Sequence, residues 1–187
     1  MVNLPNLLTF SRLFSSLILP LLFGFCFPYN NFKINLLLAL IFLLIALTDL
    51  FDGYLARQRN QVTEFGKIID PIADKFLFFC CLIPLVYFQR FHYYVAVILI
   101  ARELFVMGLR EIALTKCFQI SVSMSAKIKT TFQIILLTFI IAYPNIVLGK
   151  YFESVKIILI ALTLFWSLYS ALLYFQIFRK KFNFRFN

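Results

Sequence analysis

Residues 49–57 read DLFDGYLAR and are followed, after eight intervening residues, by Gly66 and then by Asp70 and Asp74. The stretch gathers four aspartates within 26 residues, in a chain with eight acidic residues in all. The first pair ends one apolar run and the second pair opens the next. A carboxylate beside a lipid bilayer costs several kcal/mol unless a partner holds it. The stretch therefore predicts a cation bound between the two pairs.

The composition is typical of an integral membrane protein. Hydrophobic residues make up 63% of the 187 residues and charged residues 14%, whereas a soluble domain is roughly half apolar and a quarter charged. The net charge of +10 favours an anionic membrane surface over nucleic acid as a partner, since no aromatic-basic RNA motif accompanies it. The four cysteines lack metal-ligand spacing and are interpreted as apolar packing residues. We expect a single domain over residues 1–187.

Six apolar segments predict an all-α membrane protein with six transmembrane helices in one bundle. Each is near the ~20 residues that cross a ~30 Å hydrocarbon layer as a helix, the structure that satisfies backbone groups in lipid. The segments are 10–28, 34–56, 68–89, 93–114, 128–148 and 156–177. A short interfacial segment is expected before the first span, with Pro5 at a helix start and Asn3 or Asn6 as its cap.

The basic residues predict the orientation. With a cytoplasmic N-terminus, 13 of the 18 lysines and arginines flank the inner ends of the spans and 4 lie in the outer loops. This distribution predicts that both termini are cytoplasmic. All acids except Glu153 then gather toward the inner face, where a soluble reactant can meet a lipid.

The spacing of the aspartates predicts a metal site. Asp49 and Asp52 are three residues apart and Asp70 and Asp74 are four apart, so each pair shares one face of a helix. Oxygen ligands select hard cations such as Mg²⁺, Mn²⁺ or Ca²⁺, and four carboxylates can hold two of them. Two such ions suit the binding of a diphosphate and a displacement at phosphorus.

Small and basic residues accompany the acids. Gly53 and Ala56 leave room beside the ions for a bulky group, and Arg57 can pair with phosphate oxygens. Pro71 directly follows Asp70, which predicts that the third helix starts or is distorted there.

The complete pattern, Asp-x2-Asp-Gly-x2-Ala-Arg-x8-Gly-x3-Asp-x3-Asp, resembles the signature of the CDP-alcohol phosphatidyltransferases, and all eight fixed positions are present. Within that family, further stretches are similar to the bacterial phosphatidylglycerophosphate synthases. These stretches are residues 3–12, 101–103, 108–111 and 126–133.

The resemblance implies an enzyme of the bacterial cytoplasmic membrane, frequently a homodimer, with its active site facing the cytoplasm. The implied substrates are CDP-diacylglycerol and sn-glycerol 3-phosphate, and the implied cofactor is Mg²⁺ or Mn²⁺, as two ions. By the same resemblance, Asp49 and Asp70 bridge the ions and Asp52 binds one of them. Asp74 binds the other and is the general base. The residues implied to contact the CDP-lipid are Asn6, Thr9, Gly53, Ala56, Arg57, Thr63 and Gly66.

The phosphate of the acceptor also requires cations. The candidates are Arg102, Arg110 and Lys127. Arg102 is mid-helix, where an arginine rarely faces lipid; its alternative is a buried pair with Glu103, Glu111 or another acid. Arg110 has Glu103 as an alternative partner, seven residues back on the same face. Lys129 points away from Lys127 and is interpreted as a lipid headgroup contact.

Other functions stay open at this point. The same family includes enzymes whose acceptor is serine, inositol phosphate or phosphatidylglycerol. An intramembrane prenyltransferase also uses aspartates and Mg²⁺, although with differently spaced acidic patterns. A cation transporter is a third alternative, and it predicts acids spread through the membrane depth rather than collected at one face.

Overall fold

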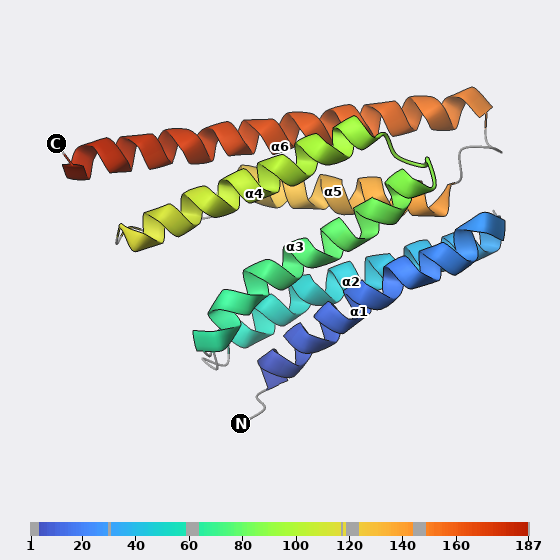
Figure 1. Ribbon diagram of the computed structural model, residues 1–187, viewed down its shortest axis with the longest axis horizontal. Helices are drawn as coiled ribbons and strands as arrows, with labels where there is room; N and C mark the ends of the chain where they lie inside the picture. The colour runs from blue at the N-terminus through green and yellow to red at the C-terminus, as the bar shows by residue number, and fades with distance from the viewer. Residues whose placement is uncertain are drawn as a thin grey trace. The chain divides into compact units, whose positions relative to one another are not determined.

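The computed structural model describes residues 4–29, 31–58, 64–116, 118, 124–143 and 149–186. For residues 4–12, 48–58, 64–74, 149–150 and 183–186 it describes the backbone alone. Across these ranges the fold is all-α, as expected, without a strand (Figure 1). The elements are α1 (Leu4–Cys26), the 3-10 turn η1 (Phe27–Tyr29), α2 (Phe32–Gln58), α3 (Glu64–Tyr87), α4 (Tyr93–Thr115), α5 (Met124–Ala142) and α6 (Gly149–Phe186).

The chain forms two compact units. Unit 1 comprises Met1–Phe91 and Leu137–Gly149, and so contains α1, η1, α2, α3 and the last turns of α5. Unit 2 comprises His92–Leu136 and Lys150–Asn187, and so contains α4, most of α5, and α6. The single domain expected over residues 1–187 stays a prediction.

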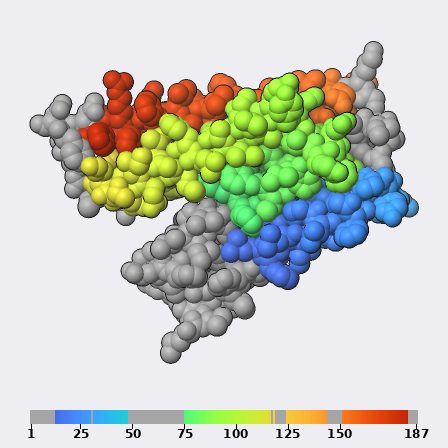
Figure 2. Space-filling model, viewed as in Figure 1, coloured from blue at the N-terminus to red at the C-terminus, as the bar shows by residue number. Residues whose placement is uncertain are grey.

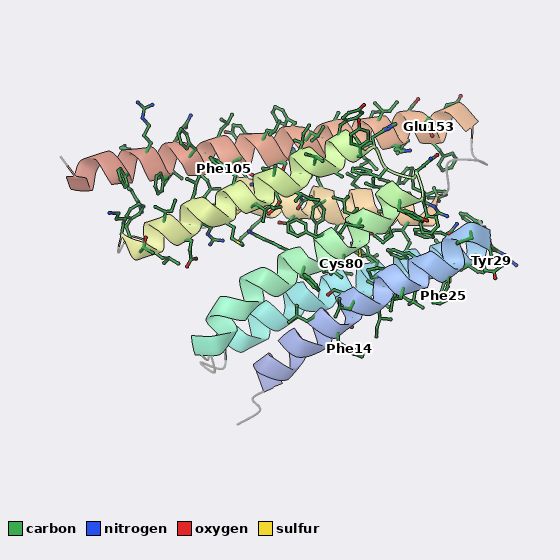
Figure 3. All side chains as sticks on the ribbon, in the orientation of Figure 1. Phe14, Phe25, Tyr29, Cys80, Phe105 and Glu153 are labelled. Carbon is green, nitrogen blue, oxygen red and sulfur yellow. The ribbon has the colours of Figure 1, made fainter. Side chains whose placement is uncertain are left out.

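In unit 1, α1 packs against both α2 and α3. The buried side chains of α1 and of the turn η1 that follows it recur at helical spacing, and Leu19, Phe23 and Phe27 are at most 3% exposed. Phe14 and Phe25 project from α1 away from its partner helices and are 67% and 75% exposed (Figure 3). The contacts from the other helices are apolar as well: Leu38, Ala39, Phe42, Ala46, Leu77, Cys81, Leu82 and Leu85 are buried.

In unit 2, an apolar cluster joins α4 to α6. Val106 and Ala113 of α4 pack with Ala171 and Tyr174 of α6. The buried positions of α6 continue from this cluster as a stripe of small polar residues, Thr163, Ser167 and Ser170. Small side chains let helices approach closely in lipid, and their hydroxyl groups bond across the contact.

The outer surfaces of both units are rich in large apolar side chains. Helices α4 and α6, which carry many of them, lie at the surface in the space-filling view (Figure 2). Among residues with described side chains, two helical stretches are long and apolar enough to span a membrane. They are Met124–Ala142, with mean hydropathy 1.4, and Tyr151–Phe182, with mean hydropathy 2.0. Shorter apolar stretches are Leu13–Tyr29, Phe32–Leu47 and Lys75–Tyr87. These surfaces indicate a membrane protein, whereas six crossings in one bundle remain a proposal.

The helix boundaries correct several expectations. The expected interfacial segment is continuous with the first helix, so Asn6 lies inside α1 and does not cap it. The third helix does not start at Asp70 but six residues earlier, at Glu64, and continues past Pro71. Neighbouring groups can compensate for the one hydrogen bond that a proline removes from a helix in a membrane protein. The last helix has 38 residues, longer than the predicted span by a turn or more at each end.

Candidate active site

The four aspartates lie on two consecutive helices of unit 1. Asp49 and Asp52 lie in α2, and Asp70 and Asp74 lie in α3. The sequence analysis assumed that these residues are helical when it placed each pair on one helix face. The backbone is helical at all four positions, so this assumption is correct. Their side chains are outside the described residues, so a metal site between them stays a prediction.

The helix bounds also give the distance of each aspartate, along its helix, from the connection between α2 and α3. The connection between α2 and α3 is five residues long, 59–63, so the two helices form an antiparallel hairpin. Asp52 is six residues before the end of α2 and Asp70 is six residues after the start of α3, so both lie about 9 Å from the turn. Asp49 and Asp74 lie about 14 and 15 Å from it. Counted along the helices, Asp52 and Asp70 are thus equally far from the connection, and Asp49 and Asp74 are nearly so.

The predicted CDP-lipid residues fall at the same end of unit 1. Asn6 and Thr9 lie in the first turns of α1, and Gly66 lies in the first turn of α3. Gly53, Ala56 and Arg57 lie in the last two turns of α2. The start of α1, the end of α2 and the start of α3 lie at one end of this unit in the ribbon view (Figure 1). Thr63 lies outside the described residues.

Unit 2 contains a buried polar cluster centred on Glu103, which is 5% exposed. Its Oε1 atom accepts hydrogen bonds from Arg102 Nη1 at 3.0 Å and from Gln133 Nε2 at 3.2 Å. The same oxygen pairs with Lys129 Nζ. This carboxylate therefore connects α4 to α5 through Lys129 and Gln133, and it also pairs with Arg102 on its own helix.

Arg102 connects the same cluster to α6. Its Nε donates to the carbonyl oxygen of Ser167 at 2.9 Å, and its Nη2 donates to the hydroxyl oxygen of Ser170. The side chain is 6% exposed, so it does not face lipid, as its mid-helix position suggested. The alternative of a buried pair with Glu103 is the arrangement that the structure contains.

Lys129 was assigned wrongly from the sequence. It is 6% exposed and pairs with Glu103, so it is not a headgroup contact. The sequence did contain a signal for this: Lys129 and Gln133 are four residues apart and share the face of α5 that reaches Glu103. The serines of α6 were missed, because nothing in their local sequence distinguishes them from other small residues of an apolar helix.

The other two candidate cations are more accessible. Lys127 is exposed, and Arg110 is partly exposed with its guanidinium carbon 6.0 Å from the centre of the Tyr174 ring. Neither forms an ion pair with any residue whose side chain is described. Their charges are therefore not neutralised within that part of unit 2.

Arg90, in the α3–α4 connection, is a buried cation besides Arg102 and Lys129, and the sequence did not single it out. It is 5% exposed, and its guanidinium lies 3.7 Å from the centre of the Phe27 ring. Nη1 donates to the carbonyl oxygen of Ile141 at 3.3 Å and Nη2 to Asn35 Oδ1 at 3.5 Å. Burial lowers the pKa of Arg90 to about 10. The contacts of Arg90 thus connect the turn after α1, the start of α2 and the end of α5 within unit 1.

Comparison with known proteins identifies the class. Residues 2–173 match the model of the CDP-alcohol phosphatidyltransferase family, so the chain belongs to that family and is a transferase. The resemblance seen in residues 49–74 is thereby confirmed.

Three relatives share the name CDP-diacylglycerol–glycerol-3-phosphate 3-phosphatidyltransferase. The protein of Rickettsia felis is 36% identical over 180 residues, 96% of this chain and 97% of the relative. That of Rickettsia typhi is 41% identical over 141 residues, 75% and 77% of the two chains. That of Salmonella choleraesuis is 37% identical over 150 residues, 77% and 79%.

Proposed function

We propose that this protein transfers a phosphatidyl group from CDP-diacylglycerol to sn-glycerol 3-phosphate, giving phosphatidylglycerophosphate and CMP in phospholipid biosynthesis. The observation that carries the proposal is the similarity to relatives named for this reaction over almost the whole of both chains. The complete aspartate pattern on α2 and α3 supplies the residues that the chemistry needs.

The donor set fits a divalent metal. Asp49, Asp52, Asp70 and Asp74 offer only oxygen ligands, from two adjacent helices and at two matched depths, which suits Mg²⁺ or Mn²⁺ as one or two ions. A bound cation supplies charge stabilisation to the diphosphate and to the developing negative charge at phosphorus.

Asp74 is the proposed general base. Its carboxylate takes the proton of the acceptor hydroxyl while that oxygen forms a bond to the phosphorus on the lipid side of the diphosphate. The bond from that phosphorus to the bridging oxygen breaks, and its electron pair leaves with CMP. Atoms and charge balance without any further reactant.

Two groups of residues bind the substrates in this proposal. The CDP-lipid contacts are Asn6, Thr9, Gly53, Ala56, Arg57, Thr63 and Gly66. Arg102, Arg110 and Lys127 serve the acceptor phosphate. The accessibility of Arg110 and Lys127 supports direct contacts from them. The donors of Arg102 already serve Glu103, Ser167 and Ser170, which favours a contribution from its charge alone.

The proposal includes the membrane arrangement. Six helices cross the bacterial cytoplasmic membrane, both termini are cytoplasmic, the aspartates face the cytoplasm and the active form is a homodimer. The excess of basic residues at the inner flanks supports this orientation.

The test is an acceptor panel with the purified protein in detergent. CDP-diacylglycerol and Mg²⁺ or Mn²⁺ are combined in turn with sn-glycerol 3-phosphate, serine, inositol phosphate and phosphatidylglycerol, and release of CMP is followed. We expect release with sn-glycerol 3-phosphate, and loss of release with a chelator. Release with another acceptor alone would reassign the substrate within the family, and no release with any would reject the proposed function.

A further inference from the structure

One exposed face of α6 changes from apolar to basic along its length. Leu168, Leu172 and Phe175 form an apolar stripe, with exposed fractions of 47%, 61% and 43%, and Arg179 follows them on the same face of the helix. Lys180, also exposed, lies beside Arg179. Arg179 is about 16 Å beyond Leu168 along the helix axis. The stripe is therefore about as long as one leaflet of a ~30 Å hydrocarbon layer is thick.

The end of unit 2 that contains Arg179 carries an excess of positive charge. The end of α4, the start of α5 and the end of α6 meet here, since Phe118 and Ala126 both pack against the cluster that joins α4 to α6. The exposed basic residues with described side chains at this end are Lys116, Lys127, Arg179, Lys180 and Lys181. Among the same described side chains, Glu111 is the single exposed acid. Whichever cation Glu111 pairs with, positive charge stays in excess, and each lysine or arginine near a membrane surface favours anionic lipid.

Aromatic contacts hold the basic end of α6 in place within unit 2. The ring centres of Phe178 in α6 and Phe118 after α4 are 5.9 Å apart. Nearly one turn earlier, the ring centre of Phe175 is 6.3 Å from that of Phe105 in α4. This part of α6 is thus packed against α4 and the residues that follow it. The cations directly after Phe178 therefore keep a fixed position relative to the apolar stripe.

We propose that this face of α6 binds an anionic phospholipid of the surrounding membrane. An acyl chain lies along Leu168, Leu172 and Phe175. The phosphate group lies at Arg179 and Lys180, from which it accepts charge-assisted hydrogen bonds. The inference depends on α6 crossing the membrane, and it does not depend on the reaction proposed above.

The order of the groups on this face favours a lipid over two other partners. A nucleic acid would pair with the cations but leave the apolar stripe uncovered. A second copy of the chain, related by a two-fold axis along the membrane normal, would set the same cations against each other, and like charges repel. A phospholipid with a net negative charge complements both the stripe and the cations.

A tryptophan on the proposed face can report which lipid lies against it. Trp166 is the only tryptophan in the chain, so Trp166→Phe removes the background, and Leu172→Trp places the reporter about 10 Å from Arg179 along the helix. The protein is reconstituted in vesicles of phosphatidylcholine and phosphatidylglycerol, with bromine on the acyl chains of one lipid or the other. Bromine quenches tryptophan fluorescence on contact. The degree of quenching therefore gives the binding constant of phosphatidylglycerol relative to phosphatidylcholine at this face.

Three variants and a second reporter position complete the comparison. Arg179→Gln/Lys180→Gln removes both charges, and Arg179→Lys/Lys180→Arg keeps them. Lys33→Gln removes an exposed cation of unit 1 and is the matched control. Val97→Trp places the reporter at a 60% exposed position near the start of α4, in place of Leu172→Trp.

We expect phosphatidylglycerol to bind about fivefold or more tightly than phosphatidylcholine at Leu172→Trp, which is the contribution of at least one basic residue near a membrane surface. The two lipids should bind within about twofold of each other in Arg179→Gln/Lys180→Gln, whereas the charge-keeping variant and Lys33→Gln should retain the preference. Val97→Trp should show little preference. Salt at ~1 M should weaken the preference at Leu172→Trp, because the Debye length falls to ~3 Å.

Equal binding of the two lipids at Leu172→Trp would overturn the proposal, as would a preference that survives the loss of both charges. Weak quenching by both lipids would show that protein covers the face, and a preference lost in phosphate but retained in chloride of equal ionic strength would assign the cations to a soluble anion. Either result would overturn the proposal.

The salt titration of the reporter protein covers the case in which Arg179→Gln/Lys180→Gln does not fold. A preference that is unchanged at ~1 M salt is not electrostatic, and it would contradict the inference. A protein that releases no CMP with any acceptor, but still prefers phosphatidylglycerol at this face, would reject the proposed function and leave the inference standing.

Discussion

Replacement of the buried cation in the α3–α4 connection, Arg90→Met, should destabilise the protein without impairing its chemistry. The variant loses the contact with the Phe27 ring, worth about 1–2 kcal/mol when the cation is desolvated. It also loses the 3.3 Å hydrogen bond to Ile141, worth about 1 kcal/mol at that length. The 3.5 Å contact with Asn35 is at the limit of a hydrogen bond and adds little.

Part of this loss is offset. The lowered pKa of Arg90 reports the cost of keeping a charge buried, and methionine fills a similar volume without that cost. We expect a net loss of about 1–2 kcal/mol, equivalent to a decrease in Tm of about 2–8 °C for a chain of this size. Turnover per folded molecule should not change, since Arg90 is not among the proposed substrate contacts.

The assay is thermal unfolding of purified protein in one detergent, combined with a double-mutant cycle. Lys33→Met removes an exposed cation from the same unit and should change stability by less than about 0.5 kcal/mol. Phe27→Leu removes the ring but keeps an apolar side chain, and its coupling with Arg90→Met should be at least about 0.5 kcal/mol. A Tm for Arg90→Met equal to that of the Lys33→Met control, or a coupling near zero, would refute the reasoning.

Three further predictions concern single residues. Asp74→Asn should abolish CMP release while Tm stays unchanged, and a purified variant with near-normal turnover would reject the assignment of the general base. Asp49→Ala should weaken both turnover and the dependence on Mg²⁺, so an unchanged metal titration would exclude it as a ligand. Asn35 is 0% exposed, and its Nδ2 lacks a partner among the described residues. Asn35→Leu should therefore raise Tm by about 2–4 °C, or roughly 1 kcal/mol, and a fall in Tm would show that the amide has a partner.

The helices could be predicted from the sequence because apolar runs of membrane length dominate it. All six predicted segments overlap the observed helices. The ends were less certain, because propensity rules for water apply poorly where lipid forces the backbone to bond internally. Pro71 is the clearest case: it suggested that the third helix starts or is distorted there, and α3 starts six residues before Asp70 and continues through Pro71.

The site was predictable where its residues are close in sequence. The aspartates lie on two helices joined by a short connection, so their spacing predicted one shared face for each pair, and the helical backbone at all four positions agrees with the premise of that prediction. The cations expected to bind the acceptor phosphate were harder to predict, because Lys127 and Lys129 are two residues apart and lie on opposite faces of α5. Which of them is buried depends on Glu103, 26 residues away along the chain.

Arg90 shows the limit of sequence reasoning. Its partners, Phe27, Asn35 and Ile141, all lie more than 50 residues from it along the chain. Two of the contacts involve a ring and a backbone carbonyl rather than an acid. No pattern of charges along the sequence predicts such a set of contacts. Only the packing of unit 1 brings the partners together.

The four charged side chains of α4 affect how the protein enters the membrane during synthesis. A charge at the centre of a helix adds about 2.5–3.5 kcal/mol to the free energy of insertion by the translocon, and α4 carries Arg102 and Glu103 near its middle. Their partners Lys129, Gln133 and Ser170 lie on helices that the ribosome makes later. With the membrane arrangement proposed above, we therefore expect stable insertion of α4 to wait until α5 and α6 have been made.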